Sequence, residues 1–338
     1  MIRWGILGLG KIANKFAEAI QEVNNANLVA IGSLTKNKLN TFGKKFNISE
    51  KYRFNTYESL LNCDEVDAVY ISTLNNTHAE LIIKSAKAGK NILCEKPMAL
   101  NENEANEVFN QLNESKVFFL EAIAYRCHPQ TEIITKLLQD DEIGKIKHVI
   151  SSFGFSEKKL LKLFPNNRLF SKKLGGGAIL DVGCYTSSFA LLIAKLFKKN
   201  DDLLKFKLKN SFGLINIRDT DDEAYTTIVF ENGFEAKLNA AIRKKMDNTS
   251  LITGSKGKMI INEPWLPGKK SYIEIESKSK NYKKEITSKY SIYACTIKIA
   301  SDFIIKKLTK CEYPLMTWED SMINMKIINE WKNSLNKN

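Results

Sequence analysis

Residues 2–13 read IRWGILGLGKIA, an apolar stretch that runs into two glycines and then into a helical pattern. In the G-x-G-x-x-A spacing, Gly8 permits a tight turn, Gly10 lets a ligand approach the backbone, and Ala13 lets the helix lie close to the strand. The helix N-terminus then faces the phosphates of a bound dinucleotide. The stretch therefore predicts a dinucleotide-binding unit at the start of the chain.

The pattern up to about Leu120 alternates short apolar runs with amphipathic helical stretches, which is typical of βαβ units and a parallel sheet. The connections are short, as in a doubly wound fold. The predicted strands are Ile2–Leu7, Leu28–Ser33, Ala68–Ser72, Asn91–Cys94 and Val117–Leu120, and the predicted helices are Lys11–Val23, Lys38–Phe46, Tyr57–Leu61, His78–Ala88 and Glu102–Asn113.

The pattern changes after about Ala122, where many strand-like segments follow one another without intervening helices, which indicates an antiparallel sheet. The predicted strands here are Ile146–Phe155, Leu208–Ile215, Tyr225–Phe230, Phe234–Ala241, Thr249–Thr253, Lys258–Ile261, Tyr272–Ser277 and Tyr282–Ile286, and the helices are Pro129–Asp140, Ala178–Phe197, Tyr293–Lys307 and Trp318–Leu335. We therefore expect an α/β Rossmann domain over 1–122 and an α+β domain for substrate binding and oligomerisation over 123–338, with the terminal helix as a candidate to pack back on the first domain.

Composition bounds the class of protein. A chain of 338 residues exceeds the usual ceiling of about 250 to 300 for a single core, which favours two domains. The start carries no basic leader, and the apolar stretch 189–197 is far shorter than the ~20 residues of a membrane span, so we expect a cytoplasmic protein without a membrane partner. The six cysteines have irregular spacings, which predicts neither disulfides nor a metal site.

The net charge of +13 lies entirely in the second part of the chain. Residues 1–150 hold 18 Lys/Arg and 18 Asp/Glu, whereas residues 151–338 hold 33 and 20. The lysines near 278–284 lie in strand-like sequence without a nucleic-acid reading motif, so we interpret them as a solvated face and expect no nucleic-acid partner. A basic domain around a pocket would still favour an anionic substrate, such as a phosphorylated or nucleotide-linked sugar.

The corner after the second predicted strand bears on cofactor choice. An NAD-selective site places a carboxylate there, yet residues 23–49 contain none, while Thr35, Lys36 and Lys38 follow Ser33. Hydroxyls and ammonium groups suit a 2′-phosphate, which favours NADP(H). NAD(H) stays possible if these lysines only coat a surface helix.

Residues 91–97 read NILCEKP, a short apolar strand that runs into a glutamate, a lysine and a proline. Lys96 then lies at the carboxyl end of the sheet, where ligands bind in open α/β folds, and Pro97 fixes the turn. A surface lysine that begins a loop is the alternative, which Glu95 and Pro97 make less attractive.

Residues 175–185 read GGGAILDVGCY and form a second glycine-rich motif. In a helix, Asp181 and Tyr185 share a face because they are four residues apart. Gly183 within the helix should cost ~1 kcal/mol relative to alanine, which indicates a close neighbour such as a cofactor ring or the other domain. A buried capping aspartate and a core tyrosine are the alternative.

These motifs, with EAIAYRCHPQ at 121–130 and NNRLF at 166–170, resemble the glucose–fructose oxidoreductase / inositol dehydrogenase (Gfo/Idh/MocA) family along nearly the whole chain, and within it the dimeric dihydrodiol dehydrogenase and NADP-dependent xylose dehydrogenase branch. The resemblance implies a Rossmann domain and an open-faced sheet that makes a homodimer or homotetramer. From their positions in the family's motifs, it implies that Tyr185 is the acid/base and that Lys96 assists it. It further implies that Arg168 faces the substrate and that Arg126 lies in the segment under the nicotinamide.

The resemblance implies an oxidoreductase that transfers a hydride between a nicotinamide and a hydroxyl or carbonyl carbon of a sugar, cyclic polyol or diol, with Asp181 orienting the network. A nucleotide-sugar ketoreductase and a non-catalytic dinucleotide sensor are the alternatives. Leu74 stands where the family usually has proline, and Leu34 where it often has arginine. The candidate cofactor-binding residues are Gly8, Gly10, Lys11, Ile12, Ala13, Ser33, Leu34, Lys36, Thr73, Leu74, Asn75, His78, Glu95, Lys96 and Arg126.

Overall fold

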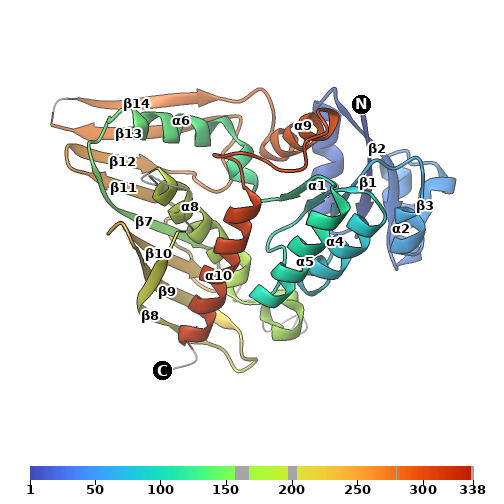
Figure 1. Cartoon of the computed structure of the whole chain (residues 1–338), viewed down its shortest axis with the longest axis horizontal. Coiled ribbons are helices and arrows are strands. Elements are labelled where there is room, and N and C mark those ends of the chain that lie inside the picture. The colour runs from blue at the N-terminus through green and yellow to red at the C-terminus, as the bar shows by residue number, and fades with distance from the viewer. Residues whose placement is uncertain (157–166, 197–203, 279, 336–338) are drawn as a thin grey trace. The chain divides into compact units, whose positions relative to one another are not determined.

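The computed structural model describes residues 1–156, 167–196, 204–278 and 280–335 (Figure 1). Its contacts divide the chain into two compact units, Met1–Cys127 with Lys289–Glu319 and His128–Ser288 with Asp320–Asn338. The units differ from the expected domain ranges, 1–122 and 123–338, mainly because the segment 289–319 returns to the first unit.

The first unit is built on one six-stranded sheet whose neighbours are all parallel. The strand order, β3-β2-β1-β4-β5-β6, is that of a doubly wound dinucleotide-binding fold. Its strands are β1 (Ile2–Leu7), β2 (Ala26–Gly32), β3 (Arg53–Phe54), β4 (Ala68–Ile71), β5 (Asn91–Cys94) and β6 (Phe119–Glu121). The sequence did not indicate β3, because two residues are too few to show a strand period.

Helices cover this sheet: α1 (Lys11–Ala19), α2 (Lys36–Lys45), α3 (Tyr57–Leu61), α4 (His78–Lys87), α5 (Glu102–Ser115) and α9 (Ile292–Ile305). Helices α4 and α5 lie side by side (Figure 1), and α1 packs against α9. The indole of Trp4 in β1 donates a hydrogen bond to the Ser301 hydroxyl of α9 at 3.0 Å. The helix that completes the first unit is therefore α9, which precedes the terminal helix.

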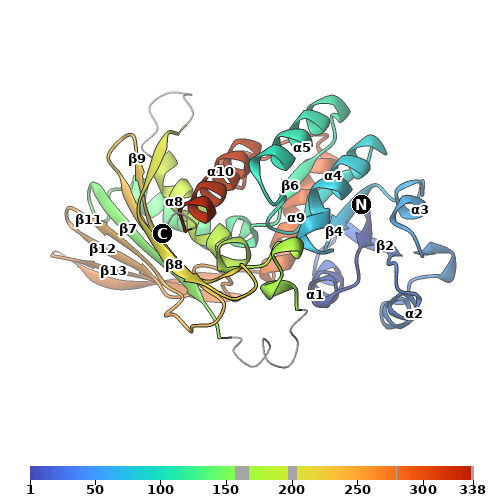
Figure 2. The same ribbon diagram turned by 90° about the horizontal axis from the view of Figure 1, so that it is seen from below.

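The second unit is built on one eight-stranded sheet of order β14-β13-β12-β11-β7-β10-β9-β8, whose strands are all labelled in Figure 1 and which Figure 2 shows from below. Its strands are β7 (Ile146–Gly154), β8 (Phe206–Ile215), β9 (Asp221–Phe230), β10 (Glu235–Ala241), β11 (Ser250–Gly254), β12 (Gly257–Ile261), β13 (Lys270–Ser277) and β14 (Asn281–Thr287). All neighbours are antiparallel except β7 and β10. The predicted mostly antiparallel sheet is confirmed.

One face of this sheet carries helices, and the alternation of side chains shows which face it is. Val149, Ile252 and Ile261 point to the covered face and are fully buried, whereas their neighbours Ile150 and Ile260 stay partly exposed. Among the described residues no helix covers the second face. Among the described residues, the helical elements of the unit are α6 (Pro129–Gln139), two 3₁₀ turns (Arg168–Phe170 and Lys172–Leu174), a π-helical turn (Ile179–Gly183), α8 (Cys184–Lys195) and α10 (Trp318–Leu335), of which α10 begins in the first unit.

The stretch Lys172–Lys195 is long and apolar enough to span a membrane, yet its apolar window is wholly buried inside the protein. A core helix of a soluble protein has the same composition, and α8 packs against β7 and β10. The predicted helix Ala178–Phe197 thus begins as a π turn, and its last residue, Phe197, lies outside the described residues.

Candidate functional site

The glycine-rich turn joins β1 to α1 and has one strained glycine and one open glycine. Gly8 has φ +90°, and a Cβ built on it would lie 2.7 Å from Cγ2 of Thr73. Ser72 donates its hydroxyl hydrogen to the carbonyl oxygen of Gly8 at 2.8 Å, which fastens the turn to the end of β4. A Cβ on Gly10 would meet nothing within 4 Å. The backbone at Gly10 is therefore open to a ligand, as a dinucleotide pyrophosphate requires.

Parallel pairing brings two turns to one edge of the sheet: the glycine turn, and the turn at Glu95, Lys96 and Pro97, which we call the EKP turn. Leu7 is in register with Ile71, and Ile71 with Cys94. The glycine turn follows Leu7, Thr73 and Leu74 follow Ile71, and Lys96 follows Cys94. Three stretches far apart in sequence therefore leave the sheet side by side at its carboxyl ends, where open α/β sheets bind ligands.

The residues around Lys96 are held on all sides. Glu95 accepts the hydroxyl hydrogen of Tyr70 at 2.5 Å, and the carbonyl oxygen of Pro97 lies 2.8 Å from Nδ1 of His78. The Met98 amide donates to Oε1 of Glu121 at 3.0 Å. The Lys96–Pro97 peptide bond is cis, and Lys96 is half-buried. The turn that presents Lys96 is thus fixed by buried groups of β4, α4 and β6.

Two phenols near Glu95 have raised pKa values. Burial, and then the charge of Glu95, raises the pKa of Tyr70 well above its usual range, and the same two causes raise the pKa of Tyr293 to about 12. Both phenols stay protonated near neutral pH. Tyr70 supports the turn through its hydrogen bond to Glu95, and both phenols are poorly suited to acid/base work. The sequence analysis missed Tyr70 and Tyr293, since neither lies in a recognisable motif.

The corner after β2 presents cations and an apolar side chain. Ser33 is buried, and its hydroxyl oxygen accepts the amide hydrogen of Thr35 at 3.2 Å. Leu34 is 72% exposed, and Lys36 and Lys38 are exposed as well. The ammonium groups are therefore accessible at this corner.

The other candidate cofactor residues of the first unit divide into a surface set and an interior set. Lys11 and Leu74 are exposed, while Ile12 and Thr73 are half-buried. The interior set consists of Ala13, Asn75, His78 and Arg126.

Arg126 is 1% exposed and donates to the carbonyl oxygen of Pro314 at 2.9 Å, and His78 is equally buried against the EKP turn. His78 thus supports the turn at Lys96 from inside the unit, whereas Arg126 ties the segment after β6 to the loop before α10.

The second glycine motif begins the helix that carries Asp181 and Tyr185. The two terminal nitrogens of the Arg168 guanidinium each donate to Oδ1 of Asp181 at 3.2 Å. The arginine predicted to face the substrate is thus paired with the carboxylate predicted to orient the network. Asn166, the first residue of the NNRLF motif, lies outside the described residues.

The close neighbour that Gly183 predicted is the indole of Trp331 in α10, since a Cβ on Gly183 would lie 3.0 Å from it. Trp331 is a fully buried core residue of the same unit. The close neighbour of Gly183 is therefore a core side chain of its own unit, and not the cofactor ring or the other domain that the sequence suggested.

Aromatic rings enclose Tyr185, which is 8% exposed. The rings of Phe153 and Trp265 lie 5.4 and 6.3 Å from the Tyr185 ring, between centroids, and stack on each other at 5.8 Å. The Trp265 indole donates to the carbonyl oxygen of Ser152 at 2.9 Å, which fixes its orientation. The edge-to-face contacts hold the phenol ring in one position. The sequence analysis missed Phe153 and Trp265, whose strand and loop positions carry no local signal.

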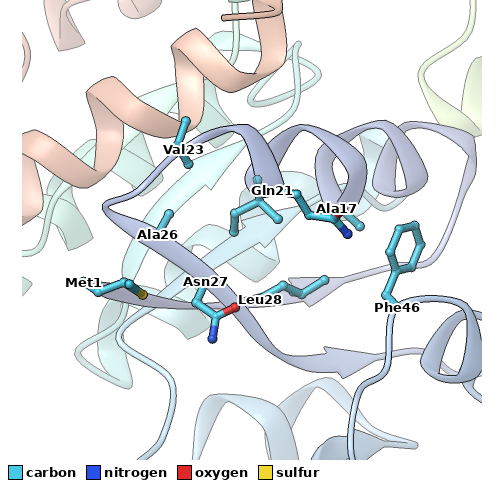
Figure 3. Close-up of a pocket in the computed structure, with 9 residues that line it drawn as sticks. Met1, Ala17, Gln21, Val23, Ala26, Asn27, Leu28 and Phe46 are labelled. Carbon is cyan, nitrogen blue, oxygen red and sulfur yellow. The ribbon is translucent and has the colours of Figure 1, made fainter.

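A cavity of about 400 Å³ lies elsewhere in the first unit (Figure 3). Its lining residues come from the amino ends of β1 and β2, from α1 and the 3₁₀ turn after it, and from the end of α2. They include Met1, Gln21, Asn27 and Leu28. The glycine turn leaves β1 at its carboxyl end, so this cavity is at the wrong edge of the sheet for the dinucleotide. Across the described residues no cluster of three His, Cys, Asp or Glu has metal-site geometry, and all six cysteines are free.

Two family models match successive parts of this chain. A family model described as "Oxidoreductase family, NAD-binding Rossmann fold" matches residues 2–122, and one described as "GFO/IDH/MocA C-terminal domain" matches residues 132–260. The trans-1,2-dihydrobenzene-1,2-diol dehydrogenases of Xenopus tropicalis and Mus musculus are each 29% identical over 268 residues. These matches cover 78% and 79% of this chain and 77% and 76% of the relatives.

Solved structures with the same fold cover nearly the whole chain. A 3-ketoreductase from Actinomadura kijaniata in complex with NADP and TDP-benzene has a TM-score of 0.84 at 22% identity, covering 99% of this chain and 97% of that one. An aldose–aldose oxidoreductase from Caulobacter crescentus complexed with glycerol has a TM-score of 0.85 at 20% identity, covering 99% and 98%.

The two family models follow one another over most of the chain. The first spans all six strands of the parallel sheet, and the second spans β7 to β11 and most of β12. The relatives are dehydrogenases and reductases of hydroxyl or carbonyl groups. The chain therefore belongs to the Gfo/Idh/MocA family and is an NAD(P)-dependent oxidoreductase that acts on CH–OH groups.

Proposed function

We propose that this enzyme interconverts a hydroxyl and a carbonyl group on a sugar, cyclic polyol or diol, with Tyr185 as acid/base and Lys96 as its assistant. The observation that carries the proposal is the shared sheet edge, where the open turn at Gly10 and the clamped turn at Lys96 follow strand residues in register. A cation at the same sheet edge as a candidate dinucleotide turn is suited to polarise a substrate oxygen.

The chemistry of the side chains follows from proton balance. A bound nicotinamide supplies the hydride acceptor or donor at its C4. The substrate hydroxyl must lose a proton on oxidation, and a carbonyl oxygen must gain one on reduction. We assign that proton to the Tyr185 phenol, which an ammonium group nearby would make more acidic. Lys96 would also donate a hydrogen bond to the substrate oxygen, while Asp181 holds Arg168 for substrate contact.

The test is a substrate screen that follows absorbance of the reduced nicotinamide, with Lys96→Met and Tyr185→Phe as the informative variants. We expect each to lower kcat by more than about a thousandfold while dinucleotide affinity stays within about threefold. The matched controls are Lys87→Met on the exposed side of α4 and Tyr272→Phe on β13, which should keep full activity. Activity of either site variant within tenfold of wild type would defeat the assignments.

For the cofactor we propose a preference for NADP(H). The exposed Lys36 and Lys38 and the absence of a carboxylate between residues 23 and 49 support it, because a 2′-phosphate needs cations there. We expect Lys36→Glu to weaken NADP binding about tenfold or more and to leave NAD binding nearly unchanged. A tighter wild-type Kd for NAD than for NADP would contradict the preference.

A ketoreductase of nucleotide-linked sugars is the second candidate, and the charge of the second part of the chain favours it. Residues 151–338 hold 33 Lys/Arg against 20 Asp/Glu. The positive electrostatic potential of this part of the chain would attract an anionic substrate. The screen should therefore include nucleoside diphosphate sugars beside neutral sugars, polyols and diols. Faster turnover of the neutral compounds would dismiss this candidate.

We propose that the uncovered face of the eight-stranded sheet pairs with a second copy of the chain. Apolar side chains on and after β8 support this, since Phe212, Leu214 and Ile217 are 58%, 59% and 99% exposed. Light scattering after size-exclusion chromatography should give a dimer or tetramer. The double variant Phe212→Lys with Leu214→Lys should give a monomer, and a wild-type monomer would contradict the proposal.

A further inference from the structure

We propose that Asp221 is a positioning residue for Tyr185: its carboxylate fixes the beginning of the helical segment that carries Asp181 and Tyr185. The proposal rests on the acid/base role assigned to Tyr185 above. Asp221 is the first residue of β9, lies far from both motifs in sequence, and belongs to the same compact unit as Tyr185.

Asp221 caps the helical segment from a neighbouring strand. The Asp221 side chain is buried, and its Oδ2 accepts the amide hydrogen of Ile179 at 2.7 Å. Ile179 is the first residue of the π turn, and Ala178 before it has no side chain able to accept a hydrogen bond. Helices usually take such a cap from the residue at their own start. Here a residue 42 positions later in the chain supplies it.

The glycine turn before the helix is shaped around this carboxylate. Gly177 has φ +108°, and a Cβ on it would lie 2.1 Å from Oδ1 of Asp221. On the other side, a Cβ on Gly176 would lie 2.5 Å from the carbonyl oxygens of Arg168 and Leu169. The Gly177 amide donates to the Leu169 carbonyl at 2.9 Å. The turn is thus held between Asp221 and the 3₁₀ turn Arg168–Phe170, with no room for a side chain.

The fixed turn sets the position of the proposed reactive groups. The Asp181 amide donates to the Gly177 carbonyl at 3.1 Å, so the turn and the π helix are directly joined. Tyr185 follows one helical turn later, where Phe153 and Trp265 enclose its ring. A shift of about 1 Å in a reacting group can cost about a hundredfold in rate, so a loosened cap should lower kcat.

The charge of the cap gives it a measurable pH dependence. Burial, the largest cause, raises the pKa of Asp221, and the neighbouring charge of Asp222 in β9 adds a smaller rise. The Ile179 amide and the cation of Lys332 in α10 lower the pKa, and the net value is about 6. Above this pKa the ionised carboxylate is the stronger acceptor for the Ile179 amide. The cap should weaken as the pH falls through about 6.

The test compares Asp221→Ala and Asp221→Asn with Asp222→Asn in the full-length protein. Asp222 is the matched control because it is adjacent and buried but pairs with Arg243 at 2.6 Å instead of the helix. Hydrogen exchange of the peptide covering 175–185, which needs no substrate, should become at least tenfold faster at its first amides in Asp221→Ala. Asp222→Asn should leave it unchanged.

The kinetic readouts separate positioning from binding. We expect kcat of Asp221→Ala to fall by at least tenfold, with KM and the dinucleotide Kd within threefold of wild type. Asp221→Asn, which keeps an oxygen acceptor, should recover part of kcat and lose the wild-type decline of kcat below about pH 6.

Three outcomes would overturn the proposal. Unchanged exchange in Asp221→Ala would show that Asp221 does not cap the helix. Faster exchange with kcat within threefold of wild type would show a cap with no positioning role. If the wild type binds dinucleotide but turns over no compound of the screen, the proposed function fails and the role falls with it, while the exchange result still reports on the cap.

Discussion

The two glycine turns of this protein resemble each other in sequence but differ in what occupies the space above them. Above Gly10 in the first unit a Cβ would meet nothing within 4 Å, whereas above Gly177 in the second unit it would lie 2.1 Å from the Asp221 carboxylate. One turn leaves its backbone open to a ligand, and the other is filled by the protein's own anion. A glycine in such a motif therefore indicates that another group comes close to the backbone, but the sequence does not show whether that group is a ligand or a side chain of the protein.

The largest effect is expected for Gly177→Ala, which should destabilise the protein by more than about 4 kcal/mol. A Cβ would collide with the carboxylate, and φ +108° is unfavourable for any residue with a side chain. Chemical denaturation gives the free energy of unfolding. Adding Asp221→Ala should recover part of the lost free energy of unfolding, because it removes the collision between the new methyl group and the carboxylate. The strain of the backbone at φ +108° remains. No recovery in the double variant would contradict the idea that the carboxylate fills the turn.

Gly8→Ala should cost about 3 kcal/mol, since the new methyl group meets Thr73 at 2.7 Å in a backbone with φ +90°. Gly89→Ala is the matched control, because it has φ +69° but open space around its Cβ. It should cost only about 1 kcal/mol. Thermal or denaturant unfolding of the two variants isolates the contact with Thr73. Equal losses would show that this contact carries no weight.

The Asp221 carboxyl should make stability depend on pH. Burial penalises the ionised carboxylate by more than its hydrogen bond to the Ile179 amide stabilises it, which is why the pKa in the folded protein is raised to about 6. The folded protein is therefore most stable below the ordinary pKa near 4 and loses stability as the pH rises through about 6, although the ionised form is the better acceptor for the cap. From pH 4 to pH 7 the wild type should therefore lose about 2 kcal/mol relative to Asp221→Asn. Parallel pH dependence of the two unfolding free energies would refute a buried ionised cap.

The smallest effect on stability is expected for Gly10→Ala, within about 0.5 kcal/mol, because the methyl group points into open space and φ −92° suits any residue. Dinucleotide affinity should nevertheless fall at least tenfold, since the backbone must come close to the pyrophosphate. Fluorescence titration with NADPH measures it. Unchanged affinity would mean that the open turn is not the phosphate site.

The sequence predicted the elements of both sheets well where periodicity was strong. The residues IRWGIL of β1 are nearly all buried, and a strand covered on both faces shows such a continuous apolar run. The alternation in β7 to β14 identified the mostly antiparallel sheet. Failure came where the signal was too short, as at the two-residue β3, or where local backbone geometry changed, as in the π turn at Ile179–Gly183.

The candidate site could be predicted only where its residues follow one another in the chain. Lys96, Asp181 and Tyr185 stand in short motifs, so the sequence alone singled them out. Tyr70 and Asp221 stand in ordinary strand sequence, and only the fold brings them against the EKP turn and the second glycine turn.

The sequence by itself determined the fold class and the candidate dinucleotide turn, because hydrophobic periodicity and glycine spacing are properties of neighbouring residues. It also indicated the family, through the resemblance of several ordered motifs. Only the tertiary structure decided which groups hold the proposed catalytic side chains in place. Strand pairing and burial bring together residues as distant in sequence as Ile179 and Asp221, and no local pattern records such a contact.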